Sequence, residues 1–443
     1  MKKHLLALSA AAVLLAPQAV GAEGFALNEW SAEGMAMGGA RMFAENDAAN
    51  LAYNPASMTK VKGEAFKVSA TYLSPHGKYK TYGKNTNVPN TEAATAGTCP
   101  MVPSENEGFQ ESGHNRVHPG WVPGSYYVRQ INDKEWVGMG IWSRFGMVSQ
   151  FEAGSLPGTN STSAKLNGLS LGVNYAKKMD KKWTASLGAE VNYVGLQVDK
   201  SPLLATIGTR DVFGHVHVEG ESYALGWNAA ANYTFDDKNE IGVVYRSKVK
   251  HSMEADYDAA MGSYGNPVGD AYGVVTLPES VMIGYNHKFN DKTRVELNGT
   301  WTRWSRYGAL NMYMDGGMGA IMQQLQGTPG SFSEKNWEDG WRYAIGIEHK
   351  LSDKYSLLGG IAYDESAIPE YPEIGADFMV PTGRRITYTI GGQYHDKDQT
   401  LALAIGWMDV GDLDIAGQHD AYDHAEMYDS YTKMVSISYQ RNF

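Results

Sequence analysis

The sequence predicts an all-β protein, a fourteen-stranded antiparallel transmembrane β-barrel with an N-terminal plug (hatch) in its lumen. Three observations predict this fold class. The chain begins with an export signal, and it contains fourteen segments in which apolar and polar residues alternate. The connections between these segments are alternately long and short. Alternation with a period of two places one set of side chains toward lipid and the other toward a polar lumen. The last such segment, 430–443, ends the chain on the aromatic Phe443, as outer-membrane barrels do.

Residues 1–22 have the layout of a signal peptide. Lys2 and Lys3 form a basic start, residues 5–15 form an apolar run too short to span a bilayer, and residues 20–22 form a small-residue cleavage site. No cysteine follows that site directly, so a lipid anchor is not expected. We therefore expect an exported protein and exclude these residues from the fold.

Composition narrows the class of protein further. Without residues 1–22 the chain loses two lysines and no acidic residue, so its formal charge changes from −11 to −13, which argues against nucleic acid as a partner. The 50 glycines, 27 tyrosines and 11 tryptophans suit tight turns and aromatic girdles. No later stretch has the roughly 18 consecutive apolar residues of a membrane helix. The single cysteine, Cys99, cannot form an internal disulfide.

Six short turns rich in Asp, Asn and Lys separate pairs of alternating segments. Asp and Asn tolerate the left-handed conformation and bond their own backbone, so such clusters predict hairpins. The turns are 132–134, 179–181, 236–238, 290–292, 352–354 and 396–398. The predicted strands lie in or near 66–73, 121–131, 134–145, 169–175, 183–193, 225–233, 241–246, 276–289, 292–304, 340–350, 354–364, 385–396, 399–408 and 430–443.

The remaining connections are predicted to be long loops. They are 74–120, 146–165, 200–222, 251–275, 305–339, 365–384 and 409–429. Short turns on one side and long loops on the other are typical of outer-membrane barrels, with the short turns in the periplasm. Charged residues on the polar strand faces would be costly in a packed soluble core but cost little in a watery lumen. These residues are Glu190, Arg246, Glu296, Arg342 and Glu348.

Residues 23–60 do not follow the barrel pattern, and the barrel is expected to cover 61–443. The segment reads as short helical or turn pieces rich in small residues, and we expect it to fill the lumen as a plug. It opens with Gly24-Phe25-Ala26-Leu27-Asn28-Glu29, continues through Gly38-Gly39-Ala40, and ends in Asn54-Pro55-Ala56 after an acidic stretch. These residues resemble the N-terminal hatch of the FadL-type outer-membrane transporters of long-chain fatty acids and other hydrophobic compounds. The resemblance extends to Asn132-Asp133 and to the segment from Trp301 to Trp304.

The resemblance implies a monomeric barrel whose hatch blocks the lumen. It further implies that ligand is caught by extracellular loops, passes to a deeper site that touches the hatch, and leaves sideways through a gap made by an inward kink in the third strand. In this sequence that strand is 134–145, with Gly138 and Gly140 inside it and Gly146 just after it. Glycine suits a kink because it relaxes backbone limits, so these three residues are the expected lateral gate, although barrel strands carry many glycines in any case.

The resemblance also implies basic residues that pair with a fatty acid carboxylate. Lys200 falls where one of them lies, whereas Glu338 replaces the second and puts headgroup recognition in question. Arg342 is a candidate substitute, with an ion pair to Glu348 or Glu296 as the alternative reading. Phe25 and Leu27, at the start of the hatch, are the expected apolar ligand contacts.

Other kinds of site have weaker support. His215 and His217, with His114 and His118 elsewhere, have neither the number nor the spacing of zinc ligands, so no metal or cofactor is expected. The acidic loop 409–429 could hold divalent cations that bridge lipopolysaccharide phosphates, or be a solvated loop. No Gly-x-Ser-x-Gly or phosphate-binding glycine-rich loop is present, and nothing places a catalytic Ser/His or Asp/His set, so an enzyme is not expected.

We therefore expect passive transport of long-chain fatty acids or similar hydrophobic compounds across the bacterial outer membrane. The partners would be the ligand, outer-membrane lipid and lipopolysaccharide. A transporter of aromatic hydrocarbons and a general porin are the alternatives. A greasy pocket discriminates poorly between chains of similar shape, so the sequence leaves the ligand open.

Overall fold

The computed structural model describes residues 24–83, 109–207, 210–326, 329–369, 376–415 and 424–443. The predicted signal peptide, Cys99 and part of the acidic loop 409–429 lie outside these residues. Within the described ranges, no helix is both long and apolar enough to cross a membrane.

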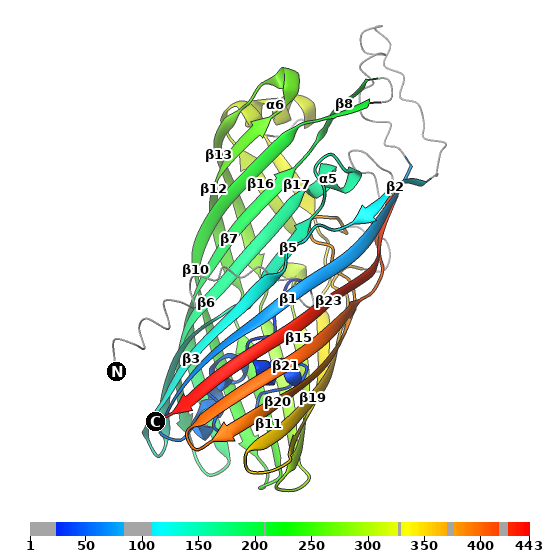
Figure 1. Ribbon diagram of the computed structural model, residues 1–443. Helices are drawn as coiled ribbons and strands as arrows, with labels where there is room; N and C mark the ends of the chain where they lie inside the picture. The colour runs from blue at the N-terminus through cyan, green and yellow to red at the C-terminus, as the bar shows by residue number, and fades with distance from the viewer. Residues whose placement is uncertain (1–23, 84–108, 208–209, 327–328, 370–375, 416–423) are drawn as a thin grey trace.

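The chain forms a closed fourteen-stranded antiparallel barrel, which confirms the predicted fold class (Figure 1). The barrel closes because β23 (His424–Asn442) pairs with β1 (Glu64–Tyr82) from Ala65↔Asn442 to Tyr82↔His424. At the chain end, the Phe443 backbone N–H donates to the Glu64 carbonyl at 2.8 Å. The first and last predicted strands therefore meet, as an even number of strands requires.

Several strands of the wall are interrupted, so each of these is made of two segments. In order around the wall the strands are β1; β3 (Gly120–Asn132); β4 (Glu135–Trp142) with β5 (Gly146–Gln150); β6 (Ser163–Lys178); β7 (Trp183–Lys200); β10 (His215–Thr234); β11 (Asn239–Arg246) with β12 (Val249–Ala260); β13 (Val268–Leu277) with β14 (Ser280–Lys288); β15 (Thr293–Thr302) with β16 (Ala309–Met314); β17 (Gly330–Glu334) with β18 (Gly340–Lys350); β19 (Tyr355–Asp364); β20 (Arg385–Asp396); β21 (Gln399–Val410); and β23.

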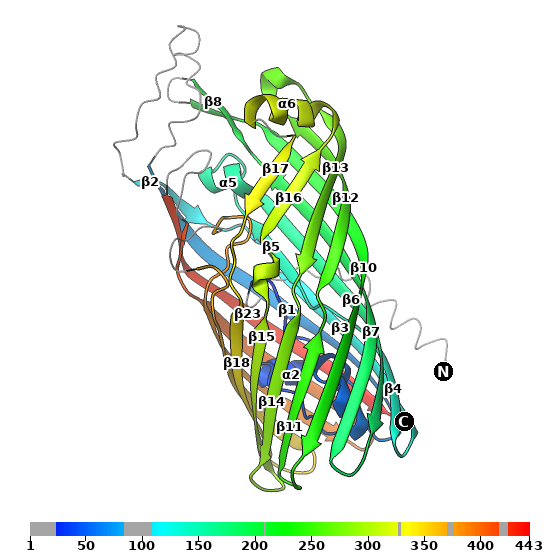
Figure 2. The same ribbon diagram turned by 180° about the vertical axis from the view of Figure 1, so that it is seen from behind.

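Smaller elements lie in the long connections or, as η3 (Trp304–Arg306) does, between two segments of one strand. The others are β2 (Phe109–His114), α5 (Leu156–Ser161), the hairpin of β8 (Leu203–Ile207) and β9 (Arg210–Phe213), η2 (Gly262–Tyr264), α6 (Gly316–Gln326) and β22 (Leu413–Ile415). Seen from both sides, the short turns lie together at one end and α6, β8 and β2 toward the other (Figures 1 and 2).

The predicted long loops are wrong in extent, because the strands continue far into them. Parts of 74–120, 200–222, 251–275, 305–339 and 409–429 are strand. In β12, for example, burial alternates strictly, with Met253 and Tyr257 inward and Glu254 and Asp256 outward. The outward residues are charged, so the segment looks like a solvated loop in sequence. The wall therefore stands well above its lipid-facing apolar band.

Residues 24–61 lie inside the barrel, where Figures 1 and 2 show their short helices enclosed by the strands. These helices are α2 (Ala32–Ala36), α3 (Asn50–Tyr53) and η1 (Pro55–Lys60), and nearly all their residues are buried. Gly38 and Gly39 turn the hatch after α2 with φ of 62° and 85°, values that favour glycine. A Cβ at Gly360 of β19 would come within 2.1 Å of the Met37 carbonyl carbon, so the hatch packs directly on the wall backbone.

Candidate functional site

Above the hatch, the inner face of the wall is apolar around most of its circumference. We call this region the chamber. Its buried side chains form one cluster that includes Phe25, Phe145, Met147, Leu166, Val194, Val218, Val249, Met253, Leu277, Trp304, Tyr307, Leu310, Met318, Trp337, Phe378 and Met427. The watery lumen expected from the polar strand faces is therefore wrong for the upper half. An apolar chamber suits a hydrophobic ligand.

Phe25, a predicted ligand contact, lies at the junction of hatch and chamber. Its ring centroid is 4.9 Å from that of Trp304, 5.0 Å from Tyr307, and 6.0 Å from both Phe145 and Trp337. The contacts with Trp304, Tyr307 and Phe145 are edge-on, an arrangement that is favourable for aromatic rings. Leu27, the other predicted contact, belongs to a different cluster with α2, β1 and β3. The structure thus brings Phe25 but not Leu27 into the chamber cluster.

The third strand is interrupted just below the chamber. Its lower segment β4 pairs with β3 up to Trp142↔Gly124. Its upper segment β5 pairs with β6 and, within the described residues, forms no ladder with β3. The ladder between the second and third strands is therefore open above Trp142.

At this break, hatch residues form backbone hydrogen bonds with the third strand where β3 does not. The Leu27 N–H donates to the Arg144 carbonyl at 2.8 Å, and the Gly146 N–H donates to the Phe25 carbonyl at 2.9 Å. Ala26 and Phe145 form an isolated antiparallel bridge between these two bonds. The backbone polar groups of the break are thus partly satisfied inward, by the hatch, instead of along the wall.

Of the three glycines of the predicted gate, Gly146 lies at the break and the other two lie below it. Gly138 and Gly140 are regular members of the β4 ladder. A Cβ at Gly138 would come within 2.6 Å of Met58 Sδ, and one at Gly140 within 2.7 Å of Leu51 Cδ2. Their common feature is the room that they leave for the hatch.

The two predicted basic residues occupy different places. Lys200 ends β7 on the same face as the chamber residues Leu196 and Val198, and is half-buried. Arg342 is buried beside the hatch, where a Cβ at Gly39 would come within 3.2 Å of its guanidinium. The Nε of Arg342 lies 3.1 Å from Asp364 Oδ1. The alternative pairing of Arg342 with Glu348 or Glu296 is wrong.

Glu348 and Glu296 pair with other cations. Arg294 lies 2.8 Å from Glu348 and 3.0 Å from Glu296. Glu296 also accepts hydrogen bonds from the backbone N–H groups of Met42 and Phe43 in the hatch. The side chain of Glu338, by contrast, is exposed. The inward charges of the lower lumen are thus buried and paired with each other or with the hatch. The sequence predicted instead that they would contact water in the lumen.

Three further basic residues near the chamber were not singled out from the sequence. Arg385 and Thr382 both donate to the Gly24 carbonyl, at 3.1 and 3.0 Å, and line a cavity of 60 Å³ beside the break. Lys335 is buried and ion-paired with Asp377 near the chamber rings. The only sequence signal for these residues was an arginine at the start of a predicted strand, since their partners are far away in the chain.

The third of these, Arg144, lies within the break itself and shares a carboxylate with Arg246. Glu190 Oε2 is 3.3 Å from Arg144, and Glu190 Oε1 is 2.6 Å from Arg246. Both arginines line a 40 Å³ cavity with Leu27 and Phe145. One carboxylate between two guanidinium groups leaves a positive charge beneath the chamber, which could attract an anionic headgroup.

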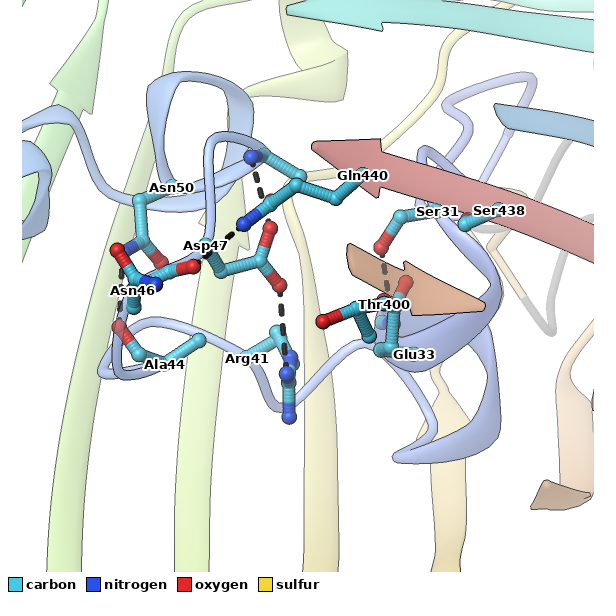
Figure 3. Close-up of polar contacts among 12 residues, drawn as sticks. Ser31, Glu33, Arg41, Ala44, Asn46, Asp47, Asn50, Thr400, Ser438 and Gln440 are labelled. Atoms are coloured by element: carbon cyan, nitrogen blue, oxygen red, sulfur yellow. Dashed lines mark hydrogen bonds and ion pairs between the residues drawn. The ribbon is translucent and has the colours of Figure 1, made fainter. Parts of the chain in front are cut away.

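Buried charges and capping groups hold the hatch in the lower lumen (Figure 3). Arg41 pairs with Asp47 at 3.3 Å and with Glu348 of β18 at 3.0 Å. Lys67 of β1 lies 2.8 Å from both Glu33 and Asp47 of the hatch. Glu33 and Asp47 are thus joined through one wall lysine.

Backbone groups of the hatch are bound by wall side chains as well. The Ala32 N–H donates to Ser438 Oγ at 2.7 Å. Gln440 Nε2 donates to the Asn46 carbonyl at 2.6 Å, as Figure 3 shows. Near the periplasmic mouth, the pKa of the Glu45 carboxyl is lowered from its ordinary value. Burial by itself would raise this pKa, but the positive charges of Lys60 and Lys288 outweigh the effect of burial.

The Asn54-Pro55-Ala56 motif has a structural role in this arrangement. Asn54 caps η1 by accepting from the Ala56 N–H at 3.2 Å, and Pro55 occupies the first helical position. The Asn54 amide also donates to Asn232 Oδ1 of β10 at 2.7 Å. The motif therefore both starts a helix and attaches it to the wall. Among the residues that the structure describes, no cluster of His, Cys, Asp and Glu is arranged to hold a metal ion.

Comparisons with known proteins agree with this geometry. A family model described as outer membrane protein transport protein (OMPP1/FadL/TodX) matches residues 12–442. The long-chain fatty acid transport protein of Escherichia coli K12 is 25% identical over 442 residues, which cover 91% of each chain. Outer membrane protein P1 of Haemophilus influenzae Rd is 28% identical over 429 residues, covering 89% of this chain and 87% of that one.

Solved structures share the fold. A FadL homologue from Pseudomonas aeruginosa superposes with a TM-score of 0.78 at 16% identity, covering 95% of this chain and 100% of that one. The toluene transporter TbuX of Ralstonia pickettii gives a TM-score of 0.66 at 16% identity, covering 94% and 99%.

The buried ion pairs predict that the hatch depends on Lys67. Lys67→Met leaves Glu33 and Asp47 buried without their shared cation, a loss of about 3–5 kcal/mol for a buried pair. We expect the hatch to loosen and the ion conductance of the protein in planar bilayers to rise. Lys62→Met, at an exposed position, is the control and should conduct as little as the wild type. Equal, low conductance of both variants would show that the Lys67 pairs do not hold the hatch.

Proposed function

Because the chain belongs to the family of outer-membrane transport proteins that includes FadL and TodX, we propose that it carries long-chain fatty acids or similar hydrophobic compounds across the bacterial outer membrane without energy input. The observation that carries the proposal is an apolar chamber that ends on a filled lumen below and a broken ladder at its side. Burial of an acyl tail contributes about 0.8 kcal/mol per methylene. Such a chamber can therefore gather these ligands from dilute solution.

In this proposal the ligand leaves sideways, through the wall at the break of the third strand. A hydrophobic molecule gains nothing from crossing to the aqueous periplasm when it can enter lipid directly. A wall opening in lipid is tolerable where its backbone groups are satisfied from within, and the bonds of Phe25 and Leu27 to Gly146 and Arg144 support this. A general porin needs an open, water-filled lumen, and the hatch in the lower lumen therefore argues against that function.

Headgroup recognition is proposed for Lys200, which lies on the chamber side of β7. Arg342 is a weaker candidate, because Asp364 already neutralises it. Arg144 and Arg246, with a single carboxylate between them, are an alternative location nearer to the hatch.

An aromatic hydrocarbon is the second candidate ligand. The rings of Phe25, Trp304, Tyr307 and Trp337 meet at the floor of the chamber, and they offer the edge-on contacts that an aromatic ligand prefers. The relative TbuX is described as a toluene transporter. We further propose a monomer surrounded by outer-membrane lipid and lipopolysaccharide, since the fourteen strands close without a second copy. The proposal assigns no catalytic step to the protein.

The lateral exit predicts the effect of a bulky residue at Gly146. Gly146→Trp should insert normally and bind ligand, yet reduce uptake of radiolabelled fatty acid by cells severalfold, because the indole obstructs the break. Gly299→Trp is the matched control, since a Cβ there meets only Trp341 at an ordinary 3.6 Å. Insertion is checked by the heat-dependent shift in electrophoretic mobility. Unchanged uptake by a correctly inserted Gly146→Trp protein would rule out this position for the exit.

The headgroup proposal predicts a difference between ligands. Lys200→Ala should weaken binding of a fatty acid about ten-fold while leaving the alcohol of equal chain length nearly unaffected, because only the carboxylate loses a charge-assisted contact. Competition against a fluorescent fatty acid measures both affinities. If the two ligands lost affinity equally, Lys200 would act by packing alone.

A further inference from the structure

One buried polar side chain of the chamber wall has hydrogen-bonding groups that the fold leaves unsatisfied. His251 is 0% exposed in β12, and neither of its ring nitrogens has a hydrogen-bond partner within the described structure. The backbone of Ser222 on β10 also acts on the ring, but one backbone group can serve only one of the two ring nitrogens. An unpaired buried polar group costs about 1–3 kcal/mol, so its presence calls for a physical reason.

The surroundings of His251 are apolar. Val249 and Met253 flank it on the same face of β12, and Val275 lies directly across from it on β13. All three belong to the cluster that contains Phe25 and Trp304. His251 is therefore a polar point on an apolar surface of the chamber.

The usual structural roles of a buried histidine do not apply here. Within the described part of the chain, no charged side chain acts on the ring, so an ion pair is not its role there. The described residues around it offer no set of metal ligands. A leucine of similar size would fill the same space without an unpaired polar group. Hydrogen-bonding capacity of the His251 ring that the protein does not use is therefore available to a molecule in the chamber.

We propose that His251 is a ligand-binding residue that hydrogen-bonds to an uncharged oxygen group, such as a hydroxyl, on a hydrophobic molecule in the chamber. Apolar surroundings favour the neutral imidazole, which has one donor and one acceptor nitrogen. A hydroxyl group can serve either nitrogen, whereas an alkane can serve neither. The inference rests on the proposed function and adds a ligand class to it, uncharged oxygenated hydrocarbons.

The site should discriminate by the presence of the oxygen group. A ligand without a hydrogen-bonding group leaves the buried polar residue unpaired. The resulting loss of binding free energy is larger than the gain from a little extra apolar contact area. In the wild-type protein, a long-chain alcohol should therefore bind at least as tightly as the alkane of the same length. Burial of an unmatched hydroxyl would have the opposite effect, because its desolvation is not compensated.

The test compares these two ligands in the wild type and three variants by competition against a fluorescent fatty acid. His251→Leu should weaken the alcohol about three- to ten-fold relative to the alkane, as expected for one hydrogen bond. His251→Gln, which keeps a donor and an acceptor, should retain most of the preference. Ser252→Ala is the matched control on the outward, exposed face of β12 and should leave the ratio unchanged.

Three results separate the outcomes. Equal shifts of both affinities in His251→Leu would assign His251 to packing and overturn the inference. Alkane binding far tighter than alcohol binding in the wild type would also overturn it, and this measurement does not depend on how any variant folds. Failure of both ligands to bind the wild type would instead contradict the proposed function.

Discussion

Backbone pairing between the N-terminal segment and the break in the third strand is the contact on which the rest of the structure depends. Lipid tolerates a wall gap only if the freed polar groups are satisfied elsewhere. Phe25 and Leu27 supply those bonds to Gly146 and Arg144. The same pairing fixes the Phe25 ring under Trp304 and Tyr307, so the floor of the chamber and the edge of the opening are set by one short piece of chain.

Charge divides the lumen into two environments. Below the chamber, inward carboxylates and cations pair across the boundary between hatch and wall, as Lys67 does with Glu33 and Asp47. A buried ion pair adds little net stability. Removing one of its partners is strongly destabilising, because the other charge is then left buried and unpaired. The hatch is therefore held by contacts that tolerate little displacement. Above it, the inner face is apolar around most of its circumference, and the charges there are few, among them Lys200 on the chamber side of β7 and the ion pair of Lys335 with Asp377.

The sequence predicted the features that repeat along the chain and missed those that depend on distant partners. Strand number and turn positions follow from alternation and from the Asp- and Lys-rich turns. Strand length was underestimated because outward residues such as Glu254 look like loop residues. The partner of Arg342 could not be foreseen, since register and the hatch together decide that Asp364 faces it. Gly138 and Gly140 could be recognised as special, but only the position of Leu51 and Met58 indicates that they make room for the hatch. His251 carried no local signal, and Arg385 carried none beyond its place at the start of a predicted strand.

Ion conductance of the intact protein and of a variant lacking residues 24–56 tests most directly whether the hatch closes the lumen. The intact protein, reconstituted in planar bilayers, should show almost no steady conductance, because the hatch fills the lower lumen and is bound to the wall by buried charges. The deletion variant should form a large, steady channel if it folds as a barrel. Large steady conductance from the intact protein would contradict the account, since an open lumen would make a lateral exit unnecessary.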